Sequence, residues 1–214
     1  MSLLLMANRR TGNVFGCAAR IAQLGHDAMS TLAKLVEEAS PAIEQAAMVM
    51  VDALVNGHKI ISCGNGASGA NAQIFVSKLL NRFDPERPAL PALALAPDSI
   101  TLSALAQDNR LTESFSRPFL AIAQTGDVLV VLSASATAPN IIAAVHAAQE
   151  RNCPVIALTG ASGGEIARLL SERDVLIQIP DHRSYRVHEA QLFTLHCCCA
   201  LIDTALFGDP DLAY

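Results

Sequence analysis

The sequence predicts an α/β fold: a flavodoxin-like, doubly wound sheet of five parallel strands, preceded by an N-terminal helical extension. From residue 58 onward, short apolar runs alternate with longer stretches of helical periodicity, which is typical of right-handed βαβ units. Apolar residues make up 51% of the 214-residue chain, and Trp is absent. This composition suits buried parallel strands covered by Ala-rich helices.

The part of the chain before residue 58 is predicted to be a helical region that packs in an oligomer. Apolar residues recur at helical spacing from Ile43 to Leu54, and Asn56-Gly57 ends the pattern. Pro41 stands where a helix can start. Residues 58–214 are predicted to form one structural unit, which gives two regions, 1–57 and 58–214.

Five apolar runs within residues 58–214 predict the strands, and helical stretches follow each of them. The predicted strands cover residues 59–63, 90–95, 127–132, 154–158 and 175–179. The predicted helices cover residues 68–82, 100–106, 112–123, 138–150, 163–170 and 184–206. Ligands of such folds bind beyond the carboxyl ends of the strands, so the loops at those ends are the candidate functional segments.

The loop from Ser133 to Thr137 follows a buried strand and precedes a helix. A helix N-terminus offers unpaired N–H groups and partial positive charge, and the hydroxyls of this loop add donors for an anion such as phosphate. The alternative is that Thr137 only caps the helix. Both interpretations are open from these residues alone.

The loop from Gly64 to Ser68 also joins a strand to a helix. Gly64, Gly66 and Gly69 fit the GxGxxG spacing, but no acidic residue stands about 20 positions further on to bind a ribose, so the dinucleotide signal is weak. The loop is a candidate ligand-contacting turn. The alternative is a tight strand-to-helix turn in which Ser68 caps the helix.

The last long helix carries two histidines that can reach one cleft. His188 and His196 are eight residues apart and share a ridge of the helix. Their position near the carboxyl ends of the strands makes a catalytic role possible for both. A single histidine on a helix is more often structural or exposed.

Charge and cysteine usage limit the classes of function. The net charge is −5 and only 16% of the residues are charged, which favours a stable homo-oligomer and excludes a basic surface for direct nucleic-acid binding. The six cysteines show no CxxC or zinc-finger spacing. They are expected to be buried free thiols of a reducing cytosol.

Nothing in the sequence resembles a secretory signal or a membrane span. The apolar run Leu3–Met6 is short and is followed by Arg9-Arg10, whereas a signal peptide carries its charges first. No uninterrupted apolar run reaches the ~18 residues that a membrane span needs. A cytoplasmic protein with no membrane partner is therefore expected.

Several segments, taken in their order along the chain, resemble the sugar-isomerase (SIS) family. The resemblance is to the group of this family that contains phosphoheptose isomerases and replication-initiator-associating proteins. The resemblance covers nearly all of the chain after the first ~15 residues. Its specificity comes from the order and spacing of the segments together. The segments are Cys63–Ser68, Leu80–Phe83, Glu86–Pro88, Gly126–Leu129, Ala157–Gly160, Gly163–Gly164, Arg186–Glu189, Leu201–Asp203 and Leu206–Phe207.

The resemblance implies a homotetramer with active sites between subunits. In the isomerases, the phosphate of sedoheptulose 7-phosphate lies in the Ser/Thr loop after the third strand, and a Glu and a His move protons between C1 and C2. By matching positions, the phosphosugar-binding residues implied here are Asn65, Ser68, Ser133, Ser135, Thr137, Asp98 and Thr159.

The chain departs from the family at the catalytic positions. The family Glu falls on Lys78, the family Gln on His188 and the family catalytic His on His196. Lys78 cannot replace a carboxylate unless burial lowers its pKa strongly. A His that binds zinc in some members falls on Ile74, so the zinc ligand set is incomplete and no cofactor is expected.

The phosphate loop departs as well. Members of the family have the sequence Ser-Thr-Ser-Gly-Asn-Ser in this loop, whereas this chain has Ser-Ala-Ser-Ala-Thr-Ala from Ser133 to Ala138. Two hydroxyls and the flexible Gly are absent, and Thr137 is the candidate partial replacement. The helix dipole remains, so phosphate binding is expected but weakened.

These departures favour a protein that acts through binding, as an oligomeric regulator that associates with the replication initiator. The alternative is an active phosphoheptose isomerase of the lipopolysaccharide heptose pathway, with His196 as one acid–base group and His188 or Lys78 as the other. A third interpretation is a phosphosugar sensor. Leu206 and Phe207 match an apolar pair at the partner-binding end of the initiator-associating proteins, or they form the buried end of a helix.

Overall fold

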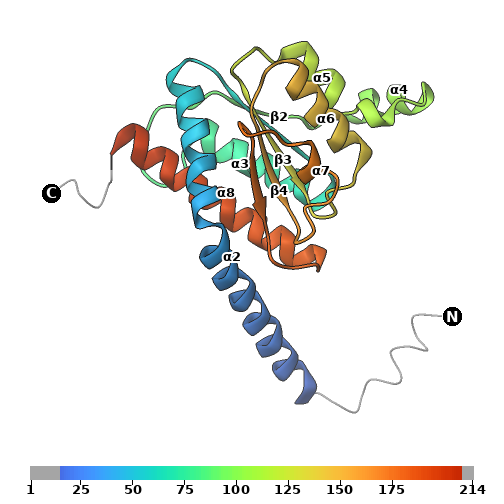
Figure 1. Cartoon of the computed structure of the whole chain (residues 1–214). Helices are drawn as coiled ribbons and strands as arrows, with labels where there is room; N and C mark the ends of the chain where they lie inside the picture. The colour runs from blue at the N-terminus through green and yellow to red at the C-terminus, as the bar shows by residue number, and fades with distance from the viewer. Residues whose placement is uncertain (1–14, 209–214) are drawn as a thin grey trace.

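A computed structural model describes residues 15–208, and it has the predicted α/β architecture. Five parallel strands form one sheet in the order β2-β1-β3-β4-β5, and helices cover both faces (Figure 1). The strands are β1 Ile60–Gly64, β2 Ala92–Ala94, β3 Val128–Ser133, β4 Val155–Thr159 and β5 Val175–Gln178. The helices are α2 Phe15–Val55, α3 Gly66–Leu80, α4 Ser99–Gln107, η1 Leu111–Glu113, α5 Ser116–Ile122, α6 Pro139–Glu150, α7 Ile166–Leu169 and α8 Ser184–Phe207.

The helix α2 is one continuous element of 41 residues, and Pro41 lies inside it. The prediction that a helix starts at Pro41 is therefore wrong. Pro41 is exposed, so water can reach the carbonyl that loses its donor, which lowers the cost of a proline at this place. The end at Asn56-Gly57 is confirmed, and Gly57 takes φ +79° after the last turn.

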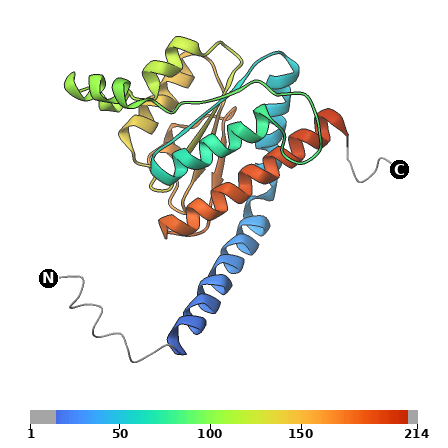
Figure 2. The same ribbon diagram turned by 180° about the vertical axis from the view of Figure 1, so that it is seen from behind.

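The two halves of α2 have different surroundings. From Leu35 to Ala53 it buries a face with a spacing of three and four residues, which is the periodicity of an amphipathic helix. The half before Thr31 begins outside the sheet and its helices (Figures 1 and 2), and it contacts them through Leu24 and Asp27, which bind Arg186 and Arg183 at the start of α8. Ile21 and Met29 on that part are 70% and 65% exposed. The division of the chain at residue 57/58 stays a prediction.

Alternate residues of each central strand enter two different cores. Ile60, Val130 and Ile156 pack with α2, α3 and α8 on one face, where α3 and α8 run side by side (Figure 2). Ile61 and Val131 pack with α5, α6 and α7 on the other face. The central strands β1, β3 and β4 are buried throughout, as expected of parallel strands that are covered on both sides.

Several predicted boundaries are wrong by a few residues or more. The strand predicted over residues 90–95 is reduced to the edge strand β2 of three residues. The helix predicted over 112–123 is divided into η1 and α5, because Pro118 has no N–H for the carbonyl of Ser114. The helix predicted over 163–170 is the four-residue α7, since Gly163 and Gly164 both take positive φ.

The helix α8 is long and apolar for a helix of this domain. By length and composition alone it could cross a membrane, with a mean hydropathy of 1.5 over its most apolar window, of which 44% is buried inside the domain. Val187, Leu195 and Ile202 of α8 belong to the core shared with α2 and α3. Its apolar character is thus explained by packing.

All six cysteines are free thiols, as expected. Cys63, Cys153, Cys198 and Cys199 are buried, and burial raises the pKa of the Cys63 thiol to about 12. Such thiols are inert at neutral pH. The expectation of burial is wrong for Cys17, which is exposed on α2.

Candidate phosphosugar site

A cavity of about 280 Å³ lies at the carboxyl ends of the strands, between the starts of three helices. It brings together five residues that the sequence analysis had singled out from three separate segments. Those five are Asn65, Ser68, Ser133, Ser135 and His188. His182 and Ser184, which the sequence analysis missed, also line it together with Leu132, Ala134 and Ala138. Their place could be found only from tertiary structure, since the segment after β5 carries no motif.

The three helices that start at this cavity lack side-chain caps. The N-cap residues are Asn65 of α3, Ala138 of α6 and Arg183 of α8, and none of them makes a side-chain cap hydrogen bond. Each helix start therefore keeps N–H groups and partial positive charge for another acceptor. This arrangement, with hydroxyls around it, suits a phosphate or another anion.

The Ser68 side chain is fixed by a hydrogen bond to α8. Its hydroxyl donates to Oε1 of the fully buried Gln191 at 3.0 Å, and Nε2 of Gln191 donates to the Leu158 carbonyl at 3.3 Å. Asn71 Nδ2 donates to the carbonyl of His188 at 2.8 Å. These bonds fix α3, α8 and β4 relative to one another beneath the cavity. Ser68 lies inside the first turn of α3, so the alternative that it caps the helix is wrong.

Asn65 forms part of the wall between this cavity and a second hollow of about 540 Å³. Its side-chain amide exchanges two hydrogen bonds with Asn140, of 2.8 and 2.9 Å. Asn140 also donates to the Ser114 hydroxyl at 3.1 Å. The amide pair thereby links the start of α3 to the start of α6 and separates the first cavity from the second hollow, which Leu102 and Leu111 help to line.

Two glycines in and after the loop between β1 and α3 allow the strand and the helix to pack closely. A Cβ on Gly64 would lie 2.7 Å from the Ser68 carbonyl carbon, and one on Gly69 would lie 2.6 Å from the Gly64 oxygen. Strand β1 and helix α3 can approach this closely only without those side chains. The GxGxxG spacing is therefore explained by the turn itself, without a dinucleotide.

The loop after β3 is rigidly held. The Ser133 hydroxyl accepts a bond from the Ala136 amide at 3.1 Å, and the Ala136 carbonyl accepts from the amides of Glu165 and Ile166. Ala136 takes φ +54°, a left-handed conformation that costs alanine about 1 kcal/mol relative to glycine. Thr137 is exposed and does not cap α6, whose N-cap is Ala138.

Two residues implied by the resemblance, Asp98 and Thr159, do not line this cavity in the single chain. Asp98 caps α4: its Oδ1 accepts from the amides of Ile100 and Thr101, both at 2.9 Å. These amide bonds, with one from the Thr101 hydroxyl, lower the pKa of the Asp98 carboxyl. Thr159 is fully buried at the end of β4, does not line the cavity, and its hydroxyl has no partner among the described residues.

Comparison with known proteins gives the family. The SIS domain matches residues 24–160 of this chain. The chain belongs to the SIS-domain family. It is 44% identical over 185 residues to the DnaA initiator-associating protein DiaA of Cronobacter sakazakii, and equally so to DiaA of Yersinia enterocolitica. In both pairs the match covers 86% of this chain and 94% of the relative.

Solved SIS-domain structures agree with this assignment. A phosphoheptose isomerase from Francisella tularensis superposes with a TM-score of 0.83 at 36% identity, covering 87% of this chain and 98% of that one. Phosphoheptose isomerase GmhA from Neisseria gonorrhoeae gives a TM-score of 0.82, with the same identity and coverage. A sugar isomerase domain of an RpiR transcription factor from Sphaerobacter thermophilus, at 20% identity and a TM-score of 0.60, shares the fold.

The two remaining candidate catalytic residues of this SIS domain lie away from the cavity. His196 is eight residues further along α8 than His188, about 12 Å at 1.5 Å per residue, and neither it nor Lys78 lines the cavity. His196 Nε2 is buried without a partner in the described part of the chain, and its ring lies 5.3 Å from that of Phe83. Burial, together with the nearby Lys78 ammonium, lowers the pKa of His196.

The described residues offer no zinc site. Within residues 15–208, no group of three or more His, Cys, Asp or Glu could hold a metal ion. Ile74 and Lys78 lie on α3, at the positions where the family resemblance implies a His and a Glu in isomerases. An apolar and a cationic side chain do not fit a zinc ion, and no step through a metal is derived.

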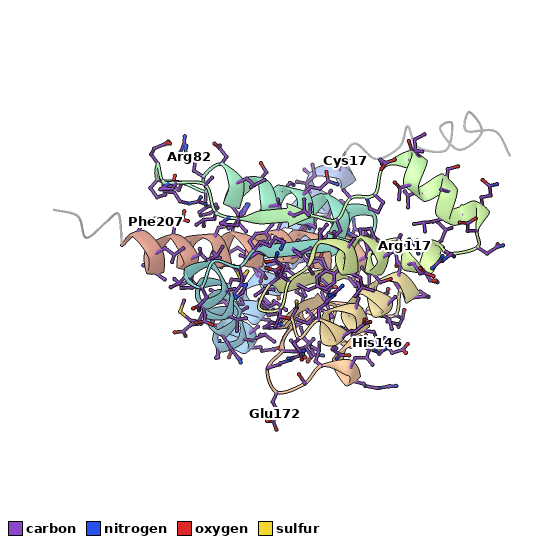
Figure 3. The ribbon with its side chains drawn as sticks, turned by 90° about the horizontal axis from the view of Figure 1, so that it is seen from above. Cys17, Arg82, Arg117, His146, Glu172 and Phe207 are labelled. Carbon is purple, nitrogen blue, oxygen red and sulfur yellow. The ribbon has the colours of Figure 1, made fainter. Side chains whose placement is uncertain are left out.

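The apolar pair at the end of α8 is divided between core and surface. Leu206 is partly buried against the core formed with α2 and α3, whereas Phe207 is 46% exposed. Figure 3 shows Phe207 at the outer end of α8, near Arg82 and far from Arg117. Phe207 is thus accessible in the single chain, and Leu206 is in part a packing residue.

Proposed function

We propose that this protein is a SIS-domain regulator that binds the replication initiator DnaA and holds a phosphosugar-like ligand without efficient turnover. The observation that carries the proposal is the 44% identity to DiaA proteins over 94% of their length. A match of this extent leaves no DiaA region of substantial size without a counterpart here. The name of those relatives states association with the DnaA initiator.

The ligand part of the proposal rests on the cavity at the three uncapped helix starts. Ser133, Ser135 and Ser184 supply hydroxyls around it, whereas the Ser68 hydroxyl donates its proton to Gln191. Hydroxyl and amide donors at helix N-termini select an oxyanion. The cavity volume of about 280 Å³ suits a small phosphorylated compound.

Lys78 disfavours efficient turnover. An ammonium group cannot accept the carbon-bound proton that a carboxylate accepts in aldose–ketose isomerisation. The Lys78 side chain is partly buried near His196, so this position carries positive charge close to the second candidate acid–base group.

A second candidate function is phosphoheptose isomerisation. It is favoured by the 36% identity to two phosphoheptose isomerases and by the unpartnered Nε2 of His196. In that case His196 acts with Lys78, which lies near it in the same chain, or with His188 of another subunit, because one chain holds His188 and His196 about 12 Å apart along α8.

The proposal includes a homotetramer in the cytoplasm. Exposed apolar side chains on α2 and α3, among them Ile21, Met29 and Ile74, support burial in an oligomer. Several copies in one assembly can engage several initiator molecules, which raises avidity. Phe207, at the outer end of α8, is the proposed partner contact.

The experiment is surface plasmon resonance with the DnaA protein of the same organism immobilised. The wild-type chain is expected to bind, and Phe207→Ala to bind at least about tenfold more weakly, as for an aromatic anchor. Tyr185→Ala is the matched control, since Tyr185 is 45% exposed at the opposite end of the same helix. Absence of wild-type binding would contradict the function, and equal loss in both variants would contradict the assignment of Phe207.

A further inference from the structure

The cavity at the three helix starts contains no residue with a permanent positive charge. Its described lining consists of apolar groups, hydroxyls, the Asn65 amide and the two imidazoles of His182 and His188. An anion site built only from dipoles and hydroxyls binds a phosphate dianion less tightly than one with a cation. The two imidazoles are the lining groups that can acquire positive charge near neutral pH.

Both histidines belong to the start of α8. His182 immediately precedes the N-cap residue Arg183, and His188 lies in the second turn. His188 is half-buried, and Asn71 Nδ2 of α3 donates a hydrogen bond of 2.8 Å to its backbone carbonyl. The resemblance places Gln at position 188 in the isomerases, so this chain has a titratable group where those relatives have a neutral amide.

The charged groups around the cavity are paired among themselves or lie elsewhere. Arg183 pairs with Asp181 and with Asp27 of α2, and Arg186 pairs with Glu189. On α3 the one charged residue is Lys78, which lies near His196. The loop of residues 133–138 and the first turn of α6 carry no charged residue. No Asp, Glu, Lys or Arg among the described residues lines the cavity itself.

We propose that His182 and His188 are the proton-linked cations of this site, so that a phosphomonoester binds together with proton uptake. The inference rests on the proposed phosphosugar site and adds how that site is regulated. The free protein keeps the cavity uncharged at pH 8, and the bound dianion stabilises the imidazolium form.

The direction of the pH dependence follows from the burial of His188, which lowers its pKa. In the free protein, burial therefore favours the neutral form of the His188 imidazole. A bound dianion raises the pKa of the imidazole, so affinity increases as pH falls from 8.0 to 6.5. Below about pH 6 the phosphate takes its own second proton, and the gain ends.

The test is isothermal titration calorimetry of the full chain with sedoheptulose 7-phosphate, and with inorganic phosphate as a second probe, at pH 6.5 and 8.0. Buffers with different ionisation enthalpies report the protons taken up. For the wild type we expect about tenfold tighter binding at pH 6.5 and uptake approaching one proton.

The variants distinguish a failure of the proton-linkage inference from a failure of the proposed phosphosugar site. His188→Gln, which has the residue of the related isomerases, is expected to bind with a much smaller pH dependence, and His182→Asn with an intermediate one. His146→Gln, on the exposed side of α6, is the control and should behave as the wild type. Binding by His188→Gln and His182→Asn with the wild-type pH dependence would overturn this inference and leave the phosphosugar site intact. No binding of either probe by the wild type at either pH would overturn both.

Discussion

At the residue scale, Gln191 explains why a serine stands at position 68. Gln191 is fully buried, and its side chain has hydrogen bonds to the Ser68 hydroxyl and the Leu158 carbonyl. A buried amide that loses a partner costs about 1–3 kcal/mol. The Ser68 hydroxyl therefore stabilises the fold as well as lining the cavity.

We expect Ser68→Ala to lower the free energy of unfolding by about 1–3 kcal/mol, because it leaves Gln191 Oε1 without its donor. Urea denaturation followed by circular dichroism measures the change. Ser77→Ala, an exposed position of the same helix, should change the value by less than about 0.5 kcal/mol. A Ser68→Ala chain as stable as the control would contradict this role.

Asp181 is the central group of an ion-pair network that joins α2 to the start of α8. Its carboxylate accepts from Arg183 and from Thr31 of α2 at 2.8 Å, and Arg183 also pairs with Asp27. The Arg183 guanidinium holds the pKa of the Asp181 carboxyl far below its usual range. The carboxylate is 8% exposed.

Because its pKa in the folded state is lowered, Asp181 contributes stability above the unfolded pKa of about 3.9. That contribution decreases as pH falls through the folded pKa. We expect Asp181→Asn to be less stable than the wild type at pH 7, with the difference shrinking below about pH 4. Thermal unfolding between pH 7 and pH 3 checks this; a difference that is constant with pH would refute it.

At the element scale, periodicity was sufficient where an element is long or fully buried. The strands β1, β3 and β4 and the helices α6 and α8 were predicted to within one or two residues, because the strands are buried throughout and the two helices keep a buried face along their length. The continuous α2 through Pro41 could not be predicted, since tolerance of the proline depends on which side of the helix faces solvent. The edge strand β2 was shortened because it has a neighbour on only one side.

The half of α2 from Leu35 onward is an integral part of one core. Leu35 is fully buried, and Leu35→Ala is expected to lower the free energy of unfolding by about 2–5 kcal/mol. Lys34→Ala, at the exposed neighbouring position, should have little effect. Guanidinium unfolding measures both; equal, small effects would indicate that α2 does not contribute to the cooperative unit.

At the scale of the whole molecule, the sequence predicted which segments contribute to the site. It predicted only in part which of their side chains meet in one cavity. The glycine and serine loops after β1 and β3 and His188 were found from sequence, because strand ends and helix starts mark them. His182 and Ser184 were missed, since only the packing of α8 across the sheet brings them to the cavity. His196 and Lys78 lie outside the cavity of the single chain, and Asp98 caps a helix.

The exposed apolar residues of α2 and α3 belong to this scale as well. Light scattering coupled to size-exclusion chromatography is expected to give four times the 22.6 kDa mass of the chain. A monomer at micromolar concentration would contradict the proposed assembly and leave Ile21 and Met29 unexplained.

The central claim is that this SIS domain binds its ligand and the initiator without acting as an isomerase. The most direct measurement is to incubate the purified protein at high concentration with sedoheptulose 7-phosphate and follow the sugar by NMR. The account predicts no conversion by the folded oligomer. Conversion that is lost in His196→Ala would contradict it, and would make the protein a phosphoheptose isomerase in which a group other than a carboxylate, His188 or Lys78, acts beside His196.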